Sequence, residues 1–218
     1  RNKDSTSSIT EDFANTELDK WAQGHKVTLT DTQRLACLRA LTAPISVLTG
    51  LPGTGKTTTL RAVVSVLQDA SVPFLLVAPT GIAAKRMASV TGSDASTVHR
   101  AFAAKGGKKD TTEDREATYV GVVGSDQSKG DSDTKKQEWG FGPDNPHPAR
   151  VVIIDESSML DLHMLYRLLQ GTMATCRMVF VGDPFQLPSV GAGDVLRDLA
   201  ASDAFPHTHL HEIFRQEG

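Results

Sequence analysis

The segment GLPGTGKT at residues 50–57 has the residue types and the spacing of a phosphate-binding loop. It fits the pattern G-x-x-x-x-G-K-[ST] in full, directly after an apolar run and directly before a helical pattern. Glycines let the backbone curl so that successive N–H groups point at one anion, and the start of the helix adds the positive end of its dipole. We expect Lys56 to reach the β- and γ-phosphates of a nucleotide and the Thr57 hydroxyl to ligate Mg²⁺. The loop residues expected to bind the nucleotide are Gly53, Thr54, Gly55, Lys56, Thr57 and Thr58.

A pair of carboxylates forms the second segment that could do chemistry. Asp155 and Glu156 directly follow the apolar run VVII at residues 151–154. A run without polar alternation is typical of a strand that is buried on both faces, and the carboxyl edge of such a sheet is also where a phosphate loop lies. We expect Asp155 to hold Mg²⁺ opposite Thr57, directly or through water, and Glu156 to orient and deprotonate the water that attacks the γ-phosphate. Without a phosphate loop in the chain, a solvated pair of acids at a strand end would be the commoner interpretation.

Alternating apolar runs and helical patterns indicate the elements that must position these residues. Largely apolar runs predict strands at residues 45–48, 74–77, 151–154 and 178–181. Periodic patterns predict helices at residues 16–23, 30–41, 57–67, 81–90 and 160–169. Because strand and helix alternate, we expect an α/β fold with a mostly parallel sheet, helices on both faces and right-handed crossovers.

Composition limits the class of protein and its partners. The 218 residues are 39% hydrophobic, which fits one large domain, or one domain with an insertion. The formal net charge of −3 gives no overall basic field, so any nucleic-acid contact must come from a local patch. Cys37 and Cys176 are far apart and lack a C-x-x-C context, which favours two reduced thiols. No apolar stretch is long enough to span a bilayer and no secretory signal is visible, so we expect a cytoplasmic protein without membrane contact.

Six further segments stand in order from residue 30 to the end of the chain. They are TDTQ at 30–33, APTGIAAKR at 78–86, STVHR at 96–100, DESSM at 155–159, VGDPFQLPSVG at 181–191 and FRQ at 214–216. In that order they resemble the Q motif, motif Ia, the T-[IV]-H-R segment, motif II, motif III and the arginine motif of superfamily 1 DNA helicases in the RecD/TraA-like branch. The resemblance implies the first motor domain of such a helicase, with a RecA-like P-loop NTPase fold that binds ATP and Mg²⁺.

The resemblance also implies roles for residues that the local chemistry would not single out. Gln33 would read the adenine edge, since an amide both donates and accepts hydrogen bonds. Gln186 would sense the γ-phosphate and relay its loss to the DNA-binding surface. Arg215 would act as an arginine finger, because its planar fork stays charged and meets phosphate oxygens bidentately. The implied catalytic residues are Lys56, Asp155, Glu156, Gln186 and Arg215.

Motif Ia and the segment at 96–100 would form the nucleic-acid face of this domain. Residues 79–81, Pro-Thr-Gly, end a strand and open a helix, which exposes N–H groups and a hydroxyl to a backbone phosphate. Single-stranded DNA held in this way would be released by salt. For Lys85 and Arg86, a solvated helix face is an equally good interpretation. The residues expected to contact DNA are Pro79, Thr80, Lys85, Arg86, Thr97, His99 and Arg100.

We expect an N-terminal extension with a helix at residues 1–29 and a motor domain (domain 1A) at 30–218, interrupted by an insertion at 104–147. The family places a small strand-separating pin (domain 1B) in this interval, and residues 119–123, Trp139 and Phe141 could build one. A flexible loop of no specific role is the alternative. Motifs of the second RecA-like domain are absent from the chain, so we expect these residues alone to bind nucleotide weakly, to hydrolyse little ATP and to unwind no duplex.

The predicted function is that of an ATP-dependent DNA helicase motor that moves along single-stranded DNA, in the 5′ to 3′ direction of the resembled branch. Its expected partners are single-stranded DNA, a second RecA-like domain of the same parent protein, and nuclease or recombination subunits. One alternative is an ATP-driven translocase module of a nuclease or a conjugative relaxase, without unwinding of its own. Another is a non-catalytic nucleotide-binding scaffold. The run HTHLH at 207–211 could place a metal on one side of a strand, but no cysteine or carboxylate cluster supports such a site.

Overall fold

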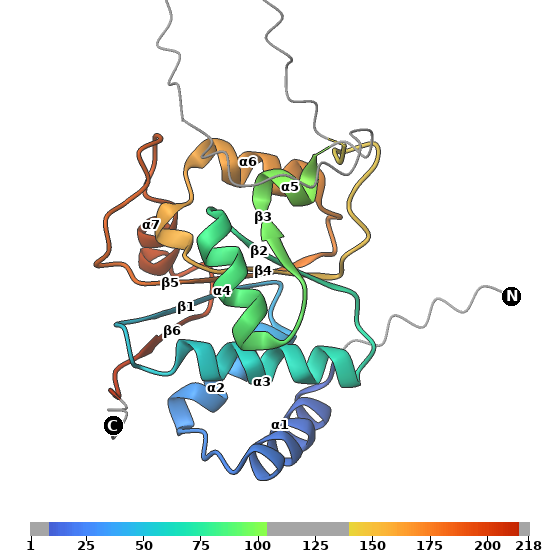
Figure 1. Cartoon of the computed structure of the whole chain (residues 1–218), viewed down its shortest axis with the longest axis vertical. Coiled ribbons are helices and arrows are strands. Elements are labelled where there is room, and N and C mark those ends of the chain that lie inside the picture. Colours follow the sequence, from blue (N-terminus) through green and yellow to red (C-terminus); the bar gives the residue numbers. More distant parts are fainter. Residues whose placement is uncertain (1–8, 104–139, 214–218) are drawn as a thin grey trace, which may run out of the picture.

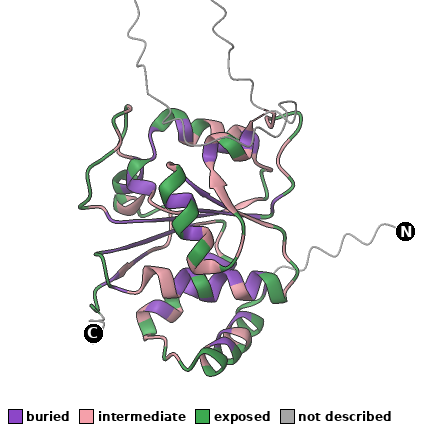
Figure 2. Cartoon of the chain, viewed as in Figure 1, coloured by how far each residue is buried: buried purple, intermediate pink, exposed green. Residues whose placement is uncertain are grey.

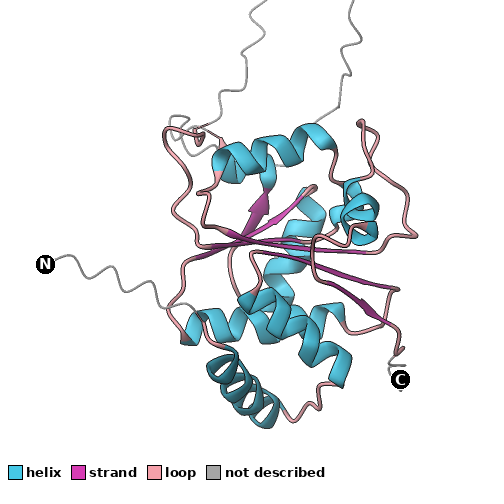
Figure 3. Cartoon of the chain, turned by 180° about the vertical axis from the view of Figure 1, so that it is seen from behind, coloured by secondary structure: helices cyan, strands magenta, loops and turns pink. Residues whose placement is uncertain are grey.

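The chain folds around one parallel sheet that carries helices on both faces (Figures 1 and 3). The computed structural model describes residues 9–103 and 140–213. Within them, a six-stranded sheet has the order β3-β2-β4-β5-β1-β6, and each strand runs parallel to its neighbours. The predicted α/β fold is thereby confirmed. The strands are β1 (Ile45–Gly50), β2 (Phe74–Ala78), β3 (Ala95–Thr97), β4 (Val151–Ile154), β5 (Arg177–Gly182) and β6 (His207–Leu210).

The helices divide into two groups, one on each face of the sheet. In Figure 1, α1, α2 and α3 lie below the sheet, while α5, α6 and α7 lie above it. Met87 of α4 belongs to the core on the α1–α3 side. The helices are α1 (Glu11–His25), α2 (Asp31–Thr42), α3 (Lys56–Asp69), α4 (Gly81–Thr91), α5 (Val98–Phe102), α6 (Leu162–Gly171) and α7 (Val195–Ala201), with the 3₁₀ turn η1 (Ser157–Met159).

The central strands are apolar throughout because both of their faces are covered. Val151 and Ile153 point into the core below the sheet, with α1 to α4. Val152 and Ile154 point into the core above it, with α5, α6 and α7. Figure 2 shows the result as a buried sheet between helices that are buried on their inner faces only. Alternating side chains of one apolar strand therefore serve two cores, as expected for a parallel sheet.

Polar residues at the helix starts fix where the helices begin. The Thr30 hydroxyl accepts the Gln33 N–H while the Gln33 side chain accepts the Thr30 N–H, a complete capping box at α2. Thr80, Thr97 and Asp161 cap α4, α5 and α6 in the simpler form, with one side-chain acceptor each. Because Asp161 is the cap, the helix predicted at 160–169 begins at Leu162 instead.

The described end of the predicted insertion packs against the core. Residues 104–139, which include 119–123 and Trp139, lie outside the described part of the chain. The Phe141 ring lies 6.2 Å from the ring of Phe102, edge to face, and 4.7 Å from the ring of His147. Phe141 therefore serves as a support for α5 in this structure, and the pin stays a prediction for the segment before it. No helix among residues 9–103 and 140–213 is long and apolar enough to cross a membrane.

Candidate nucleotide-binding site

The phosphate loop connects β1 to α3 in the conformation that its glycines allow. Gly53 and Gly55 have φ values of 82° and 90°, in the left-handed region that side chains disfavour. A Cβ placed on Gly50 would lie 2.5 Å from Thr54 Oγ1 and 3.1 Å from the Leu210 carbonyl oxygen. Thr54 is buried, and its hydroxyl donates to the Leu51 carbonyl at 2.8 Å. The loop is thus closed on itself, with α3 starting at Lys56 directly behind it.

Lys56 folds back over the mouth of this loop. Its ammonium group donates to the carbonyl oxygens of Gly50 and Leu51, at 2.5 and 3.0 Å. Burial lowers the pKa of Lys56, while the charges of Asp183, Glu156 and Asp155 act in the opposite direction. The carboxylates at the neighbouring strand ends thus lie near enough to Lys56 for their charges to act on it.

Asp155 and Glu156 directly follow the end of β4. The Asp155 Oδ1 atom accepts the Glu156 N–H at 2.9 Å, which fixes this carboxylate at the sheet edge. Burial raises the pKa of Asp155, as does the charge of Glu156, whereas Arg86 and Lys56 lower it. Glu156 has a φ of 52°, a left-handed conformation that is unfavourable for a residue with a Cβ. Its side chain lies 3.8 Å from Arg86 Nη1, measured from Oε1.

The strand order explains why these groups meet. β4, β5 and β1 are neighbours in the sheet and parallel, so their carboxyl ends lie at one edge. Asp155 follows β4, Asp183 follows β5, and the phosphate loop follows β1. The predicted convergence of Lys56 with both acids at one edge therefore agrees with the topology. The described residues offer oxygen ligands for Mg²⁺ in Asp155 and Thr57, with Thr57 in the first turn of α3.

Asp183 is a site residue that the sequence analysis did not single out. Its side chain is 3% exposed, and Oδ1 accepts the Phe185 N–H at 2.9 Å. It is the first polar residue after an apolar strand, in the same position as Asp155 after β4. That shared position is the signal that would have found it.

The loop after β5 presents Gln186 to solvent. The Gln186 N–H donates to the Asp183 carbonyl at 3.2 Å, and the side chain is exposed. Around it, Phe185, Leu187 and Val190 are 76%, 86% and 99% exposed. Arg215, the other residue expected at the γ-phosphate, lies outside the described residues.

Gln33 lies in the first turn of α2 with only 3% of its surface exposed. Its Oε1 atom accepts the Thr30 N–H at 3.1 Å, and its own N–H donates to Thr30 Oγ1 at 3.2 Å. The side-chain carbonyl is therefore engaged in the capping box, and reading an adenine through both amide atoms would require this bond to exchange.

The residues expected to contact DNA gather at the ends of β2 and β3. These strands are parallel neighbours, and Ala78 is in register with Thr97. Pro79 and Thr80 thus come next to the start of α5, which carries His99 and Arg100. The hydroxyls of Thr80 and Thr97 each accept one N–H as helix caps and keep a proton to donate. Burial lowers the pKa of His99, and the nearby Asp161 charge opposes that shift.

The two basic residues of α4 differ in their surroundings. Lys85 and Arg86 are both exposed. Arg86 Nη1 lies 3.8 Å from Glu156 Oε1, so its side chain reaches towards the nucleotide edge.

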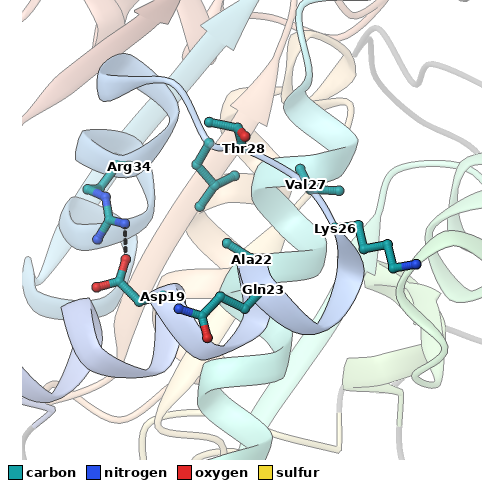
Figure 4. Close-up of a pocket in the computed structure, with 8 residues that line it drawn as sticks. Asp19, Ala22, Gln23, Lys26, Val27, Thr28 and Arg34 are labelled. Carbon is teal, nitrogen blue, oxygen red and sulfur yellow. Dashed lines mark hydrogen bonds and ion pairs between the residues drawn. The ribbon is translucent and has the colours of Figure 1, made fainter.

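A separate pocket lies between α1 and the start of α2, with a volume of about 440 Å³ (Figure 4). Arg34 of α2 joins the two helices at this pocket. It forms an ion pair with Asp19 and donates a 3.0 Å hydrogen bond to Asn15 Oδ1, both on α1. None of the predicted catalytic residues lines it. Among the described residues, no group of three or more His, Cys, Asp or Glu side chains could hold a metal ion, the histidines of β6 included.

Comparison with known proteins defines the class. Residues 28–218 match the family model of the AAA domain, and the chain belongs to that family. It is 32% identical over 183 residues to the RecBCD enzyme subunit RecD of Haemophilus influenzae, covering 83% of this chain and 28% of that protein. It is 34% identical over 177 residues to the ATP-dependent RecD2 DNA helicase of Deinococcus radiodurans, covering 78% of this chain and 19% of that protein. The resemblance to RecD-like helicases is confirmed, and the chain spans less than a third of the length of these relatives.

Solved structures agree with the fold. The Pif1 helicase from Candida albicans superposes with a TM-score of 0.56 at 23% identity, over 88% of this chain and 42% of that one. A structure of two coordinating Pif1 helicases at forked double-stranded DNA gives a TM-score of 0.51 at 22% identity, over 88% of this chain and 46% of that one. At these identities the likeness concerns the fold, and it confirms the RecA-like P-loop architecture.

Proposed function

We propose that this chain is the ATP-binding and ATP-hydrolysing motor domain of a DNA helicase that moves 5′ to 3′ along single-stranded DNA. The observation that carries the proposal is the meeting of Lys56, Asp155, Glu156 and Asp183 at one edge of the sheet, beside the phosphate loop. A lysine beside a phosphate loop, with carboxylates at the neighbouring strand ends, suits a triphosphate with its divalent metal ion. The names of the relatives support the same activity.

The loop fits ATP through its backbone and through Lys56. The left-handed glycines Gly53 and Gly55 keep side chains out of the cradle, and α3 points its N-terminus at it. The Lys56 ammonium group would exchange the carbonyl oxygens of Gly50 and Leu51 for oxygens of the β- and γ-phosphates. Thr54 holds the loop closed, and Gly53, Gly55, Thr57 and Thr58 would contribute N–H groups. Gln33 would contact the adenine through its free amide protons.

The residues of the chain fit Mg²⁺ at one position. Thr57 Oγ1 and the Asp155 carboxylate would hold the ion, which neutralises developing charge on the phosphates when it is bound. Glu156 would orient and deprotonate the attacking water. Gln186 would sense the γ-phosphate from its exposed loop, and Arg215 would approach it as an arginine finger.

Single-stranded DNA would lie across the ends of β2 and β3. The free hydroxyl protons of Thr80 and Thr97, the N-terminus of α4 and the exposed side chains of Lys85 and Arg100 would contact its phosphates. Pro79 and His99 would complete this surface. Arg86 has a second partner in Glu156, whose Oε1 atom lies 3.8 Å from its Nη1 atom.

Residues 30–218 would form domain 1A of a longer motor, with an insertion at 104–147 and an N-terminal helix that packs on α2 and α3. A second RecA-like domain of the parent protein would close the cleft opposite the phosphate loop. Recombination or nuclease subunits are further proposed partners, because several relatives are named as subunits of the RecBCD enzyme. Such a motor would act in the cytoplasm, in DNA repair or recombination.

The test measures nucleotide binding and hydrolysis separately. A fluorescent ATP analogue is titrated into this chain, and ATPase activity is measured in the full-length protein with and without single-stranded DNA. Lys56→Ala should weaken analogue binding at least tenfold, about 1.4 kcal/mol. Glu156→Gln should leave binding intact and lower kcat by a factor on the order of 10²–10⁴. We expect this chain alone to bind weakly and to hydrolyse little ATP.

Matched variants keep these outcomes specific. Lys20→Ala on α1 removes an exposed lysine whose partner is Glu17 and should change neither binding nor hydrolysis. Unchanged analogue affinity in Lys56→Ala would contradict the proposal and favour a scaffold. Hydrolysis that DNA does not stimulate would contradict the DNA motor while leaving an ATPase.

A further inference from the structure

Arg86 and Glu156 are brought together by the fold alone. Arg86 lies in the middle of α4, and Glu156 lies just beyond β4. The two side chains meet at 3.8 Å, between Nη1 and Oε1. The arginine side chain is 69% exposed, whereas the glutamate side chain is 24% exposed. One end of this pair is therefore open to solvent, whereas the other is mostly buried.

The charge of Arg86 also acts on the rest of the site. The pKa of Asp155 is raised chiefly by burial, and Arg86 is one of the charges that oppose this rise. The pKa of Lys56 is lowered chiefly by burial, and Arg86 adds to that decrease. Arg86 thus belongs electrostatically to the nucleotide edge, although α4 also carries the surface expected to bind DNA.

We propose that Arg86 is a positioning residue that restrains Glu156 in the absence of DNA and releases it when DNA binds. This inference rests on the proposed function, because it assigns the control of the same water-activating carboxylate. A carboxylate that orients water must direct an oxygen at that water. While the Glu156 Oε1 atom is paired with the Arg86 guanidinium, that oxygen is not directed at the attacking water.

The geometry favours exchange of this partner for a DNA phosphate. Charge-assisted N–H···O hydrogen bonds are usually about 2.7–2.9 Å long, so the 3.8 Å contact is loose. A guanidinium binds a phosphate with two parallel hydrogen bonds, which is a better match than one long contact. The phosphate would arrive at the N-terminus of α4, where Thr80 follows β2 by two residues and caps the helix that carries Arg86. DNA binding and release of Glu156 would then be one event.

The experiment compares Arg86→Ala with Arg61→Ala in the full-length protein. Arg61 is an exposed arginine of α3, away from the expected DNA surface. Steady-state ATPase is measured with no DNA and with a saturating oligothymidylate. We expect Arg86→Ala to raise the DNA-free kcat about two- to fivefold, which corresponds to about 0.4–1 kcal/mol of an exposed ion pair. The KM for ATP should stay unchanged, and stimulation by DNA should fall by at least the same factor.

Conservative variants separate positioning from general effects. Arg86→Lys keeps the positive charge and should restore much of the restraint, so its DNA-free kcat should lie closer to wild type. Arg86→Gln has no charge and should behave like Arg86→Ala. It replaces the alanine variant in this test if Arg86→Ala does not fold. Circular dichroism and the thermal midpoint are recorded for each variant.

Different failures have different signatures. A DNA-free kcat of Arg86→Ala that equals that of Arg61→Ala, or falls below wild type, would overturn the inference. Stimulation by DNA that stays at the wild-type ratio would overturn the release step. A wild-type protein that neither binds the ATP analogue nor hydrolyses ATP would instead overturn the proposed function itself.

Discussion

Thr49 and His209 face each other across the ladder between β1 and β6, with 2.7 Å between Thr49 Oγ1 and His209 Nδ1. The same hydroxyl lies 2.7 Å from His207 Nε2. Thr49 is fully buried, and a hydroxyl has one proton to donate. At most one histidine can therefore accept that proton, so at least one of the two donates an N–H to Thr49 Oγ1. The pair of imidazoles beside the phosphate loop is held by a single buried oxygen.

Thr49→Val should destabilise the protein by about 1–3 kcal/mol, because the isosteric methyl leaves two ring nitrogens without this partner. The measurement is the free energy of unfolding from urea denaturation. Thr42→Val, at an exposed position at the end of α2, is the control and should change the free energy by less than about 0.5 kcal/mol. Equal values for both variants would show that the shared hydroxyl contributes nothing.

Acid should destabilise the fold through these histidines. Burial lowers the pKa of His207 and of His209. The charge of His209 lowers the pKa of His207 further, and the charge of His211 does the same to His209. Arg39 also lowers the pKa of His207. Lys56 lowers the pKa of His209, whereas the charge of Asp183 raises it. Below the unfolded pKa of about 6.5, the unfolded chain binds more protons than the folded one, so stability decreases as the pH is lowered.

The measurement is the urea midpoint at about pH 7.5 and about pH 5.5, on either side of the unfolded pKa. We expect a lower midpoint at the acidic pH, and a smaller decrease in His207→Gln than in wild type. His163→Gln, on the exposed side of α6, should keep the wild-type decrease. A midpoint that rises on acidification would contradict the sign of this linkage.

Cys37 should be inert in the folded protein. Its thiol is fully buried, donates to the Thr59 carbonyl at 3.7 Å, and has a pKa that burial raises to about 12. The thiolate is the reactive form, so modification requires unfolding. In a Cys176→Ala background, the rate of labelling by a thiol reagent should follow the unfolded fraction as urea is added. Rapid labelling in the absence of urea would contradict this burial. Cys176, half-buried with a pKa of about 11, should react sooner in the reverse variant, Cys37→Ala.

Two glycines should respond oppositely to alanine. A Cβ on Gly182 would lie 2.7 Å from Leu196 Cδ2 and 3.2 Å from the backbone nitrogen of Ser157, so Gly182→Ala should destabilise by about 1–3 kcal/mol. Gly24 lies within α1 with no atom within 4 Å of such a Cβ, so Gly24→Ala should stabilise by about 0.5–1 kcal/mol. Thermal midpoints of both variants against wild type test the pair, and a change of the same sign in both would contradict the packing described.

The features predictable from sequence are those whose physical cause is local. The strands at 45–48 and 151–154 are recognisable because burial on both faces leaves no polar alternation, and the loop before Lys56 because glycine is needed there. β3 and α7 have no such signal. Ala95–Thr97 is short, polar and only half-buried, and Val195–Ala201 spans barely two turns. Neither is long enough for a period to stand out.

The residues of the candidate site also divide into those with a local signal in the sequence and those without one. Asp155 is predictable because it directly follows an apolar run, and Asp183 carries the same signal after β5. The contact between Arg86 and Glu156 joins α4 to the end of β4, and no spacing in the sequence encodes it. The left-handed backbone of Glu156 likewise has no signal in the residue types around it, whereas the capping box of Gln33 is local and has the T-x-x-Q spacing of such a motif.

The contacts that Lys56 makes with its own loop affect which ligands can bind there. Two carbonyl oxygens already accept two of the three N–H groups of this ammonium, so a ligand that displaces both must offer more than they do together. A lone chloride or a single small anion supplies one contact and gains little by displacing them. A chain of linked phosphates supplies several charged oxygens at once and also engages the N–H groups of the glycines. The position of Lys56 would therefore favour a ligand with several linked phosphates over a single small anion, before any base or sugar is recognised.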